Sequence, residues 1–192
     1  MSQMVLEGLE RELVEACRRG ERDAFRALFE TYKGKVYSVA LRFSGSQAAA
    51  MDIAQDTFLK LFSCIGEFRG DSGFETWVYR MVVNRCLDQK RRSRRLVPLA
   101  DSFLASLSVP GDALAGLLRS EVSARVKAAV EKLPPEMRIA IVLRYTEGLS
   151  YDRMAEVLGC SQGTVASRLN RAHKALERRL SHMVDRPGGN RG

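Results

Sequence analysis

Apolar residues recur every three to four positions along most of this chain. The first such series consists of Leu9, Leu13, Ala16, Phe25, Leu28, Phe29, Tyr32, Val36 and Val39. A spacing near 3.6 residues is typical of helices that bury one face, whereas a half-buried strand alternates at every second residue. No stretch of the sequence alternates in that way, so the sequence predicts an all-α fold.

Short interruptions divide the first half of the chain into four predicted helices. Gly20 separates the first two, and Ser44-Gly45-Ser46 ends the second. The third is expected from about Gln47 to Cys64. Residues 65–77 contain three glycines and have no periodicity, so they are predicted to form a loop. A long helix of about residues 75–94 follows.

The composition changes after this helix. Residues 96–118 contain two prolines and several serines but no basic residue, which is typical of a linker. Helices are expected to resume near Ser120, and Pro134-Pro135 then ends one helix and starts the next. The sequence therefore predicts two small helical domains, residues 1–95 and 120–184. A flexible linker of residues 96–119 joins them, and residues 185–192 form a disordered tail.

A short helix, a turn and a longer helix are predicted near the C-terminus. SYDRMAEVLG (150–159) forms the first helix, and residues 161–183 form the second. Gly159 can adopt the left-handed conformation that ends a helix, and the Ser161 hydroxyl can cap the next one. This arrangement is a helix-turn-helix, a motif whose second helix enters the major groove of DNA.

The second helix of this motif has one apolar and one polar face. Val165, Leu169 and Ala172 lie on the apolar face. On the polar face short side chains come first and basic ones later, so the N-terminal end can approach base edges while arginine and lysine bind guanine or phosphate. The residues predicted to contact DNA are Ser161, Gln162, Thr164, Ser167, Arg168, Arg171 and Lys174.

The alternative is that this helix is merely basic and solvated, as most charged helix faces are. The preceding turn, the cap at Ser161 and the small residue Ala155, which permits close helix crossing, favour DNA recognition. The net charge of +8 agrees with an anionic partner, although it suits nucleic acid and an acidic membrane surface alike.

A second set of polar residues includes the only tryptophan. On the predicted helix 75–94, Trp77 shares a face with Arg80, Asn84, Asp88 and Arg91. An aromatic ring among cations suits unpaired bases, which stack on the ring while arginine neutralises the backbone. The glycine-bearing loop before it could hold a base taken out of the stack. Alternatively, Trp77 simply packs against that loop, as a largely buried tryptophan would.

The third predicted helix carries an acidic face. Asp52, Gln55 and Asp56 lie together, opposite a stripe predicted to be buried that includes Met51 and Phe58. In a basic protein such a face could meet a basic partner protein, or it could be ordinary surface.

Several functional classes are disfavoured. The four cysteines are far apart and form no zinc pattern with the two histidines, so neither a metal nor a cofactor is expected. The sequence predicts neither a signal peptide nor membrane insertion, which suggests a cytoplasmic protein. An enzyme acting on DNA would need a nucleophile or a carboxylate cluster, and none is evident.

Three blocks of sequence resemble the signature blocks of the bacterial sigma-70 family, in its smallest, extracytoplasmic-function (ECF) group. They are DIAQDTFLKLF (52–62), FRGDSGFETWVYRMVVNRCLDQKRR (68–92) and KLPPEMRIAIVLRYTEGLSYDRMAEVLGCSQGTVASRLNRAHKAL (132–176). The resemblance covers about residues 10–182. It implies a sigma factor, a subunit without catalysis of its own that binds core RNA polymerase and promoter DNA. An anti-sigma factor is a further partner that the resemblance implies.

The resemblance also implies roles for the three sets of residues. Asp52, Gln55 and Asp56 would bind the clamp helices of the polymerase. The helix-turn-helix residues would recognise the −35 element. Recognition and melting of the −10 element would involve Phe68, Arg69, Phe74, Trp77, Arg80, Asn84, Asp88, Arg91 and Arg92.

Two positions depart from the family pattern. Ala166 stands where relatives often carry lysine, and His173 where they often carry arginine. Both lower the positive charge of the recognition helix, which affects the expected −35 preference. The competing interpretation is a stand-alone helix-turn-helix regulator, which would need neither Trp77 nor the acidic face.

Overall fold

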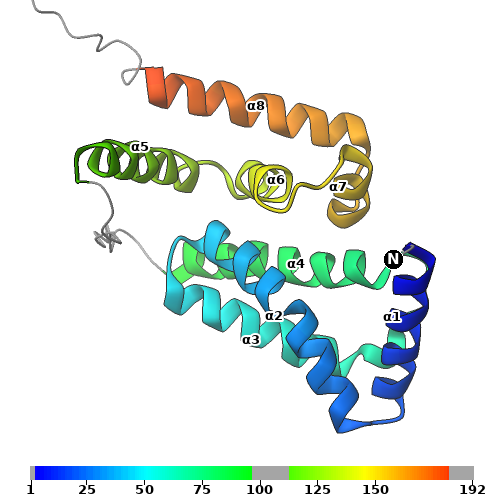
Figure 1. The fold of residues 1–192 in the computed structure, drawn as a ribbon. Helices are drawn as coiled ribbons and strands as arrows, with labels where there is room; N and C mark the ends of the chain where they lie inside the picture. The colour runs from blue at the N-terminus through cyan, green and yellow to red at the C-terminus, as the bar shows by residue number, and fades with distance from the viewer. Residues whose placement is uncertain (1–2, 97–112, 182–192) are drawn as a thin grey trace, which may run out of the picture.

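The fold is all-α, as predicted. A computed structural model describes residues 3–96 and 113–181, and these ranges contain helices and no strand (Figure 1). The N-terminal unit, residues 3–96, consists of α1 (Gln3–Arg18), α2 (Arg22–Ser44), α3 (Gln47–Ser63), the 3-10 helix η1 (Ile65–Glu67) and α4 (Phe74–Leu96). The C-terminal unit, residues 113–181, contains α5 (Ala113–Glu131), α6 (Pro135–Tyr145), α7 (Tyr151–Leu158) and α8 (Gln162–Leu180).

The predicted helix breaks are confirmed, and glycines at positive φ make two of them. Gly20 has φ of 81°, and Gly45, with φ of 75°, closes α2 by donating its N–H to the Leu41 carbonyl. Ser46 caps the next helix by accepting from the Ala49 N–H. A residue with a Cβ pays a steric penalty in this left-handed conformation, which explains glycine at these positions.

The start of α5 corrects the predicted linker. The helix begins at Ala113, not near Ser120, so residues 113–119 belong to it. ALAGLL is rich in alanine and leucine, and their helix propensity outweighs the single Gly116. The rest of the predicted linker, residues 97–112, and the predicted tail, residues 185–192, lie outside the described residues.

One continuous apolar core runs through both units. Phe43, Leu28 and Leu61 are fully buried in the N-terminal unit, and Leu143 and Met154 in the C-terminal unit. The prediction for Met51 was wrong, because its side chain is 61% exposed. The buried face of α3 is therefore rotated about the helix axis relative to the predicted buried face.

The two units pack against each other. Figure 1 shows α6 and α7 lying between α8 and the layer formed by α2, α3 and α4. The contacts join α4 to α7 and α2 to α6. Within the described ranges no helix is long and apolar enough to cross a membrane.

Candidate nucleic-acid interface

The predicted helix-turn-helix is present as α7, a turn and α8. Ser150 caps α7 by accepting from the Arg153 N–H at 3.3 Å. Gly159, with φ of 60°, ends α7, and its N–H bonds back to the Ala155 and Glu156 carbonyls. The Ser161 hydroxyl then accepts from the Thr164 N–H at 3.2 Å, as predicted for the cap of α8. At the start of each helix, the serine thereby satisfies one backbone N–H that has no partner within the helix itself.

The outer face of α8 carries most of the predicted DNA-contacting residues. Val165, Leu169 and Ala172 face inward and are buried. The residues exposed on the other side are Ser161, Gln162, Ser167, Arg171 and Lys174, with Thr164 half-buried at the edge. This side therefore offers short polar groups at the N-terminus and cations one to three turns later.

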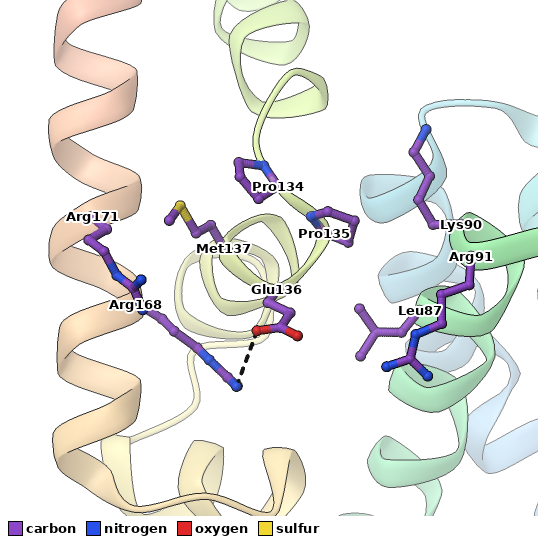
Figure 2. A pocket seen from close by; sticks show the side chains of 9 residues that line it. All are labelled: Leu87, Lys90, Arg91, Pro134, Pro135, Glu136, Met137, Arg168 and Arg171. Atoms are coloured by element: carbon purple, nitrogen blue, oxygen red, sulfur yellow. Dashed lines mark ion pairs between the residues drawn. The ribbon is translucent and has the colours of Figure 1, made fainter. Parts of the chain in front are cut away.

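Arg168 lies on the flank of α8 and has a partner within its own unit. Its guanidinium pairs with the Glu136 carboxylate at 3.3 Å, and its side chain is only 20% exposed. Figure 2 shows this pair at the N-terminus of α6. Because the charge is neutralised there, Arg168 is less available to DNA than Arg171.

The polar face of α4 borders a groove of about 440 Å³. The predicted residues Trp77, Arg80, Asn84 and Asp88 all line it. The structure adds Lys60, Met81 and Arg85, which the sequence analysis missed. The charge of Arg85, next to Asn84 in the sequence, was a signal that could have found it. Lys60 comes beside this face only because α3 packs against α4, so its charge alone could not have placed it there. Arg91 and Arg92 are exposed further along α4.

Three aromatic rings form a cluster where the loop joins α4. The ring centroids of Phe68 and Trp77 are 5.3 Å apart, those of Phe74 and Trp77 are 5.5 Å apart, and those of Phe68 and Phe74 are 5.1 Å apart. Trp77 therefore packs against the loop, and its side chain is half-buried. Phe74 is 4% exposed and also contacts Tyr32, so in this state it supports the loop and is not accessible to a base.

The glycine-bearing loop borders a cavity of about 620 Å³ together with α1. Phe68, Arg69 and Asp71 line it from the loop, and Arg11 and Arg18 line it from α1. Arg18 also donates to the Phe68 carbonyl and so ties α1 to the loop. The contribution of α1 was not predicted.

The acidic face of α3 is fully accessible. Asp52, Gln55 and Asp56 are all exposed, as predicted. Met51 and Leu59, each 61% exposed, lie beside them at helical spacing. Exposed apolar side chains next to carboxylates make this a mixed surface, of the kind found where proteins meet.

The cysteines are separate and mostly protected. Cys17, Cys64 and Cys86 are buried, whereas Cys160 is half-buried beside the start of α8. Burial raises the pKa of the Cys86 thiol to about 12, and it raises those of Cys17 and Cys64 as well. Among the residues that the structure describes, no three His, Cys, Asp or Glu side chains are grouped so that they could hold a metal ion.

A further cavity, of about 360 Å³, lies between the two units. Leu87, Lys90 and Arg91 of α4 line one side, and Arg168 and Arg171 of α8 line the other. Figure 2 shows these two groups on opposite sides of the N-terminus of α6. Residues predicted to contact two separate DNA elements therefore border one cavity.

Comparisons with known proteins give two family-model matches and several similar curated proteins. Residues 28–96 match the family model for sigma-70 region 2, and residues 123–176 match that for sigma-70 region 4. The RNA polymerase sigma-H factor of Pseudomonas aeruginosa is 34% identical, over 94% of this chain and 98% of its own length. The ECF RNA polymerase sigma-E factor of Escherichia coli is 33% identical, over 91% and 95%.

Solved structures are also similar to this chain. The structure of CnrH in complex with the cytosolic domain of CnrY has a TM-score of 0.65 at 26% identity, covering 90% of this chain and 97% of that one. The sigma factor RpoE of Bartonella quintana, solved in complex with the anti-sigma factor NepR, has a TM-score of 0.64 at 25% identity. It covers 84% of this chain and 98% of that one.

Proposed function

The chain belongs to the ECF group of the sigma-70 family, whose members direct promoter-specific transcription. We propose that it does so by reading a −35 and a −10 element while bound to core RNA polymerase. One observation carries the proposal. The chain has two separate polar and basic faces, on α8 and on α4, and each lies in one of the two regions that match the family models.

The face of α8 is proposed to recognise the −35 element. Ser161, Gln162 and Thr164 are close to the N-terminus of the helix, the end that approaches base edges in helix-turn-helix proteins. Arg171 suits guanine or phosphate, and Lys174 suits phosphate. Ser167 lies between the two groups, and Arg168 would first have to leave Glu136.

The groove along α4 is proposed to hold the −10 element after melting. Trp77 is at one end, with Arg80, Asn84 and Asp88 following along the groove. Phe68 and Arg69 border the adjacent loop cavity, which has room for a flipped base. Stacking on an aromatic ring returns about 1–3 kcal/mol per base, which offsets part of the cost of unstacking. Phe74 acts by holding Trp77 and Phe68 in place, and Arg91 and Arg92 add backbone contacts.

The acidic face of α3 is proposed to dock on the clamp of the polymerase. Asp52, Gln55 and Asp56 supply charge and hydrogen-bonding groups, and Met51 and Leu59 supply apolar area. An interface of this kind steers association through its charges and is held by its apolar contacts. The combination is what distinguishes this face from ordinary surface.

An anti-sigma factor is proposed as a second protein partner. The support is that CnrH and RpoE, which match 90% and 84% of this chain, were solved in complex with the cytosolic domain of CnrY and with NepR. We expect the protein to work in the cytoplasm, where the polymerase is, and to have no catalytic activity of its own.

Reconstituted transcription tests the proposal. Purified chain and core polymerase are combined on genomic DNA, and transcription starts are mapped with and without the chain. New starts that share upstream elements at a fixed spacing are expected. A chain that binds duplex DNA without altering the starts would instead be a stand-alone regulator, and the proposal would fail.

A further inference from the structure

The second half of α1 is held firmly against the rest of the N-terminal unit. Val14 and Cys17 are 3% and 1% exposed and belong to the core. Glu10, one turn earlier, accepts a hydrogen bond from the Tyr32 hydroxyl of α2. Tyr32 is 2% exposed, and burial raises the pKa of its phenol, so the hydroxyl keeps the proton that it donates. Side chains on the neighbouring face of α1 therefore have a fixed starting point.

That neighbouring face borders the loop that precedes α4. Arg11, Glu15 and Arg18 are four and three residues apart, so they share one face of the helix. All three line the cavity of about 620 Å³ whose other wall is formed by residues 68–74. Small-molecule sites occupy about 300–1,000 Å³, so this cavity has room for one nucleotide.

Arg18 connects α1 to the loop. One terminal nitrogen of its guanidinium pairs with the Glu15 carboxylate at 2.5 Å, and the other donates to the Phe68 carbonyl. The Phe68 ring in turn packs against the rings of Trp77 and Phe74. Glu15 therefore orients Arg18, and Arg18 fixes the backbone that carries a ring of the aromatic cluster.

The charges that line the cavity are not balanced. Two of its three carboxylates, those of Glu10 and Glu15, are already bonded within the N-terminal unit. In the described part of the chain, the exposed side chains of Arg11 and Arg69 form no ion pair or hydrogen bond, and Asp71 is the one carboxylate left to oppose them. Excess positive charge in a cavity raises the local concentration of anions, so the cavity suits a base that carries a phosphate.

We propose that α1 forms part of the binding site for the melted −10 strand, with Arg18 as a positioning residue and Arg11 as a phosphate contact. Arg18 holds the Phe68 ring where a base can stack, and Arg11 neutralises the backbone of the same strand. Both arginines precede residues 28–96, so the match to the region 2 family model assigns them no role. The inference rests on the proposed function, because it adds residues to the proposed −10 face.

The two arginines are expected to affect binding in different ways. Removal of a base that stacks on an aromatic ring weakens binding about fivefold or more, and we call this factor the abasic penalty. Arg18→Ala releases the Phe68 carbonyl, so the abasic penalty should fall to less than about twofold. Arg11→Ala leaves the ring in place and keeps the penalty. It removes one phosphate contact, which should lower the slope of log affinity against log salt by about 0.7 and weaken binding about fivefold at 0.1 M salt.

The test uses holoenzyme assembled from the full chain and core polymerase. Fluorescence anisotropy measures the binding of a labelled single strand that carries the −10 element found by start-site mapping. The strand is used intact and with one abasic position at a time, over a range of salt concentrations. The control is Arg19→Ala, which removes an exposed cation directly after α1 that pairs with Glu21 at 2.7 Å and does not line the cavity. It should change neither the abasic penalty nor the salt slope.

Two further variants distinguish positioning from a general loss of stability. Arg18→Lys keeps a donor for the Phe68 carbonyl and should restore part of the abasic penalty. Glu15→Ala removes the partner that orients Arg18 and should lower the penalty, although Glu15 is itself 55% exposed and contributes little to the core. Far-UV circular dichroism verifies the folding of each variant, and Glu15→Ala takes the place of Arg18→Ala if the latter unfolds.

Several results would overturn the inference. One is an Arg18→Ala holoenzyme that keeps the wild-type abasic penalty, and another is a wild-type holoenzyme with no abasic penalty at any position. Equal loss of salt slope in Arg11→Ala and Arg19→Ala would show an effect of net charge alone. Failure of the proposed function is a separate result, in which the wild-type holoenzyme binds the −10 strand no more tightly than a scrambled strand.

Discussion

The Trp77 ring packs against the Phe68 ring with 5.3 Å between centroids, so the only tryptophan ties the glycine-bearing loop to the start of α4. The same ring borders the groove of the proposed −10 face. Packing and base contact are therefore not alternatives for this side chain. The ring can therefore hold the loop and line the groove at the same time.

Trp77→Ala is expected to lower the free energy of unfolding by about 2 kcal/mol, less than the 3–5 kcal/mol of a fully buried tryptophan because Trp77 is half-buried. Promoter opening should fall further than this loss explains. Urea titration gives the stability, and permanganate reactivity of the −10 element gives the opening. Trp77→Phe, which keeps a stacking ring, should retain most of both. Equal loss of closed-complex binding and of opening would mean that Trp77 only packs.

Ser161→Ala and Ser150→Ala form a matched pair, because each removes the cap of one helix of the helix-turn-helix. Each is expected to cost about 1 kcal/mol of stability, as the loss of a side-chain cap does. Ser161 also belongs to the proposed −35 face, so only Ser161→Ala should weaken transcription from promoters that depend on the −35 element. Thermal unfolding and run-off transcription measure the two effects. If both variants were equally active in transcription, Ser161 would not be a DNA contact.

Asp56→Lys tests the acidic face of α3. The reversal of charge is expected to weaken binding of core polymerase at least tenfold at low salt and less at high salt, since salt screens exposed charges. Glu30→Lys is the control, because it makes the same change on an exposed position of α2. Fluorescence anisotropy of labelled chain with core polymerase measures the affinity. The same loss for both variants would indicate a general effect of net charge instead of a docking face.

Much of this arrangement could be predicted from sequence, because it is encoded locally. The turn at Gly45, the cap at Ser161 and the left-handed Gly159 all use residues whose preference for these positions is a matter of backbone geometry. The exposed acidic face followed from the helical period alone. These features need no knowledge of what packs against them.

The docking of the units could not be predicted, because its residues are unremarkable in sequence. From sequence alone, Arg138 and Glu147 resemble ordinary solvated charges. Only the positions of α2 and α4 show that both residues lie at the contact between the units. The prediction for Met51 was wrong for a related reason. The helical period shows which residues share a face, but it does not show how that face is rotated toward the core. Phe74 was placed among DNA contacts, although its neighbours Tyr32 and Phe68 bury it.

The thiols give a test of burial that is independent of DNA. At pH 8 a thiol reagent is expected to modify Cys160 quickly and Cys17, Cys64 and Cys86 only as fast as the protein opens, because reaction needs an accessible thiolate. Burial raises the pKa of Cys86 from 9.0 to about 12, so the native state holds this proton more tightly than the unfolded state. That contribution to stability is complete below pH 9 and is lost as the pH rises toward 12. Cys160→Ser should abolish the fast phase, and a fast phase from any other cysteine would contradict the packing.

Arg171→Ala is the most direct test of the −35 face. Arg171 is exposed on α8, and loss of a base-edge contact is expected to cost about 1–3 kcal/mol and to relax sequence preference at one position of the element. Arg178→Ala is the matched control, because Arg178 is also exposed on α8 but lies two turns further from its N-terminus. Transcription from a library of promoters with randomised −35 elements measures both affinity and preference. Uniform weakening across the library would assign Arg171 to the phosphate backbone, where a residue positions the protein without reading the sequence.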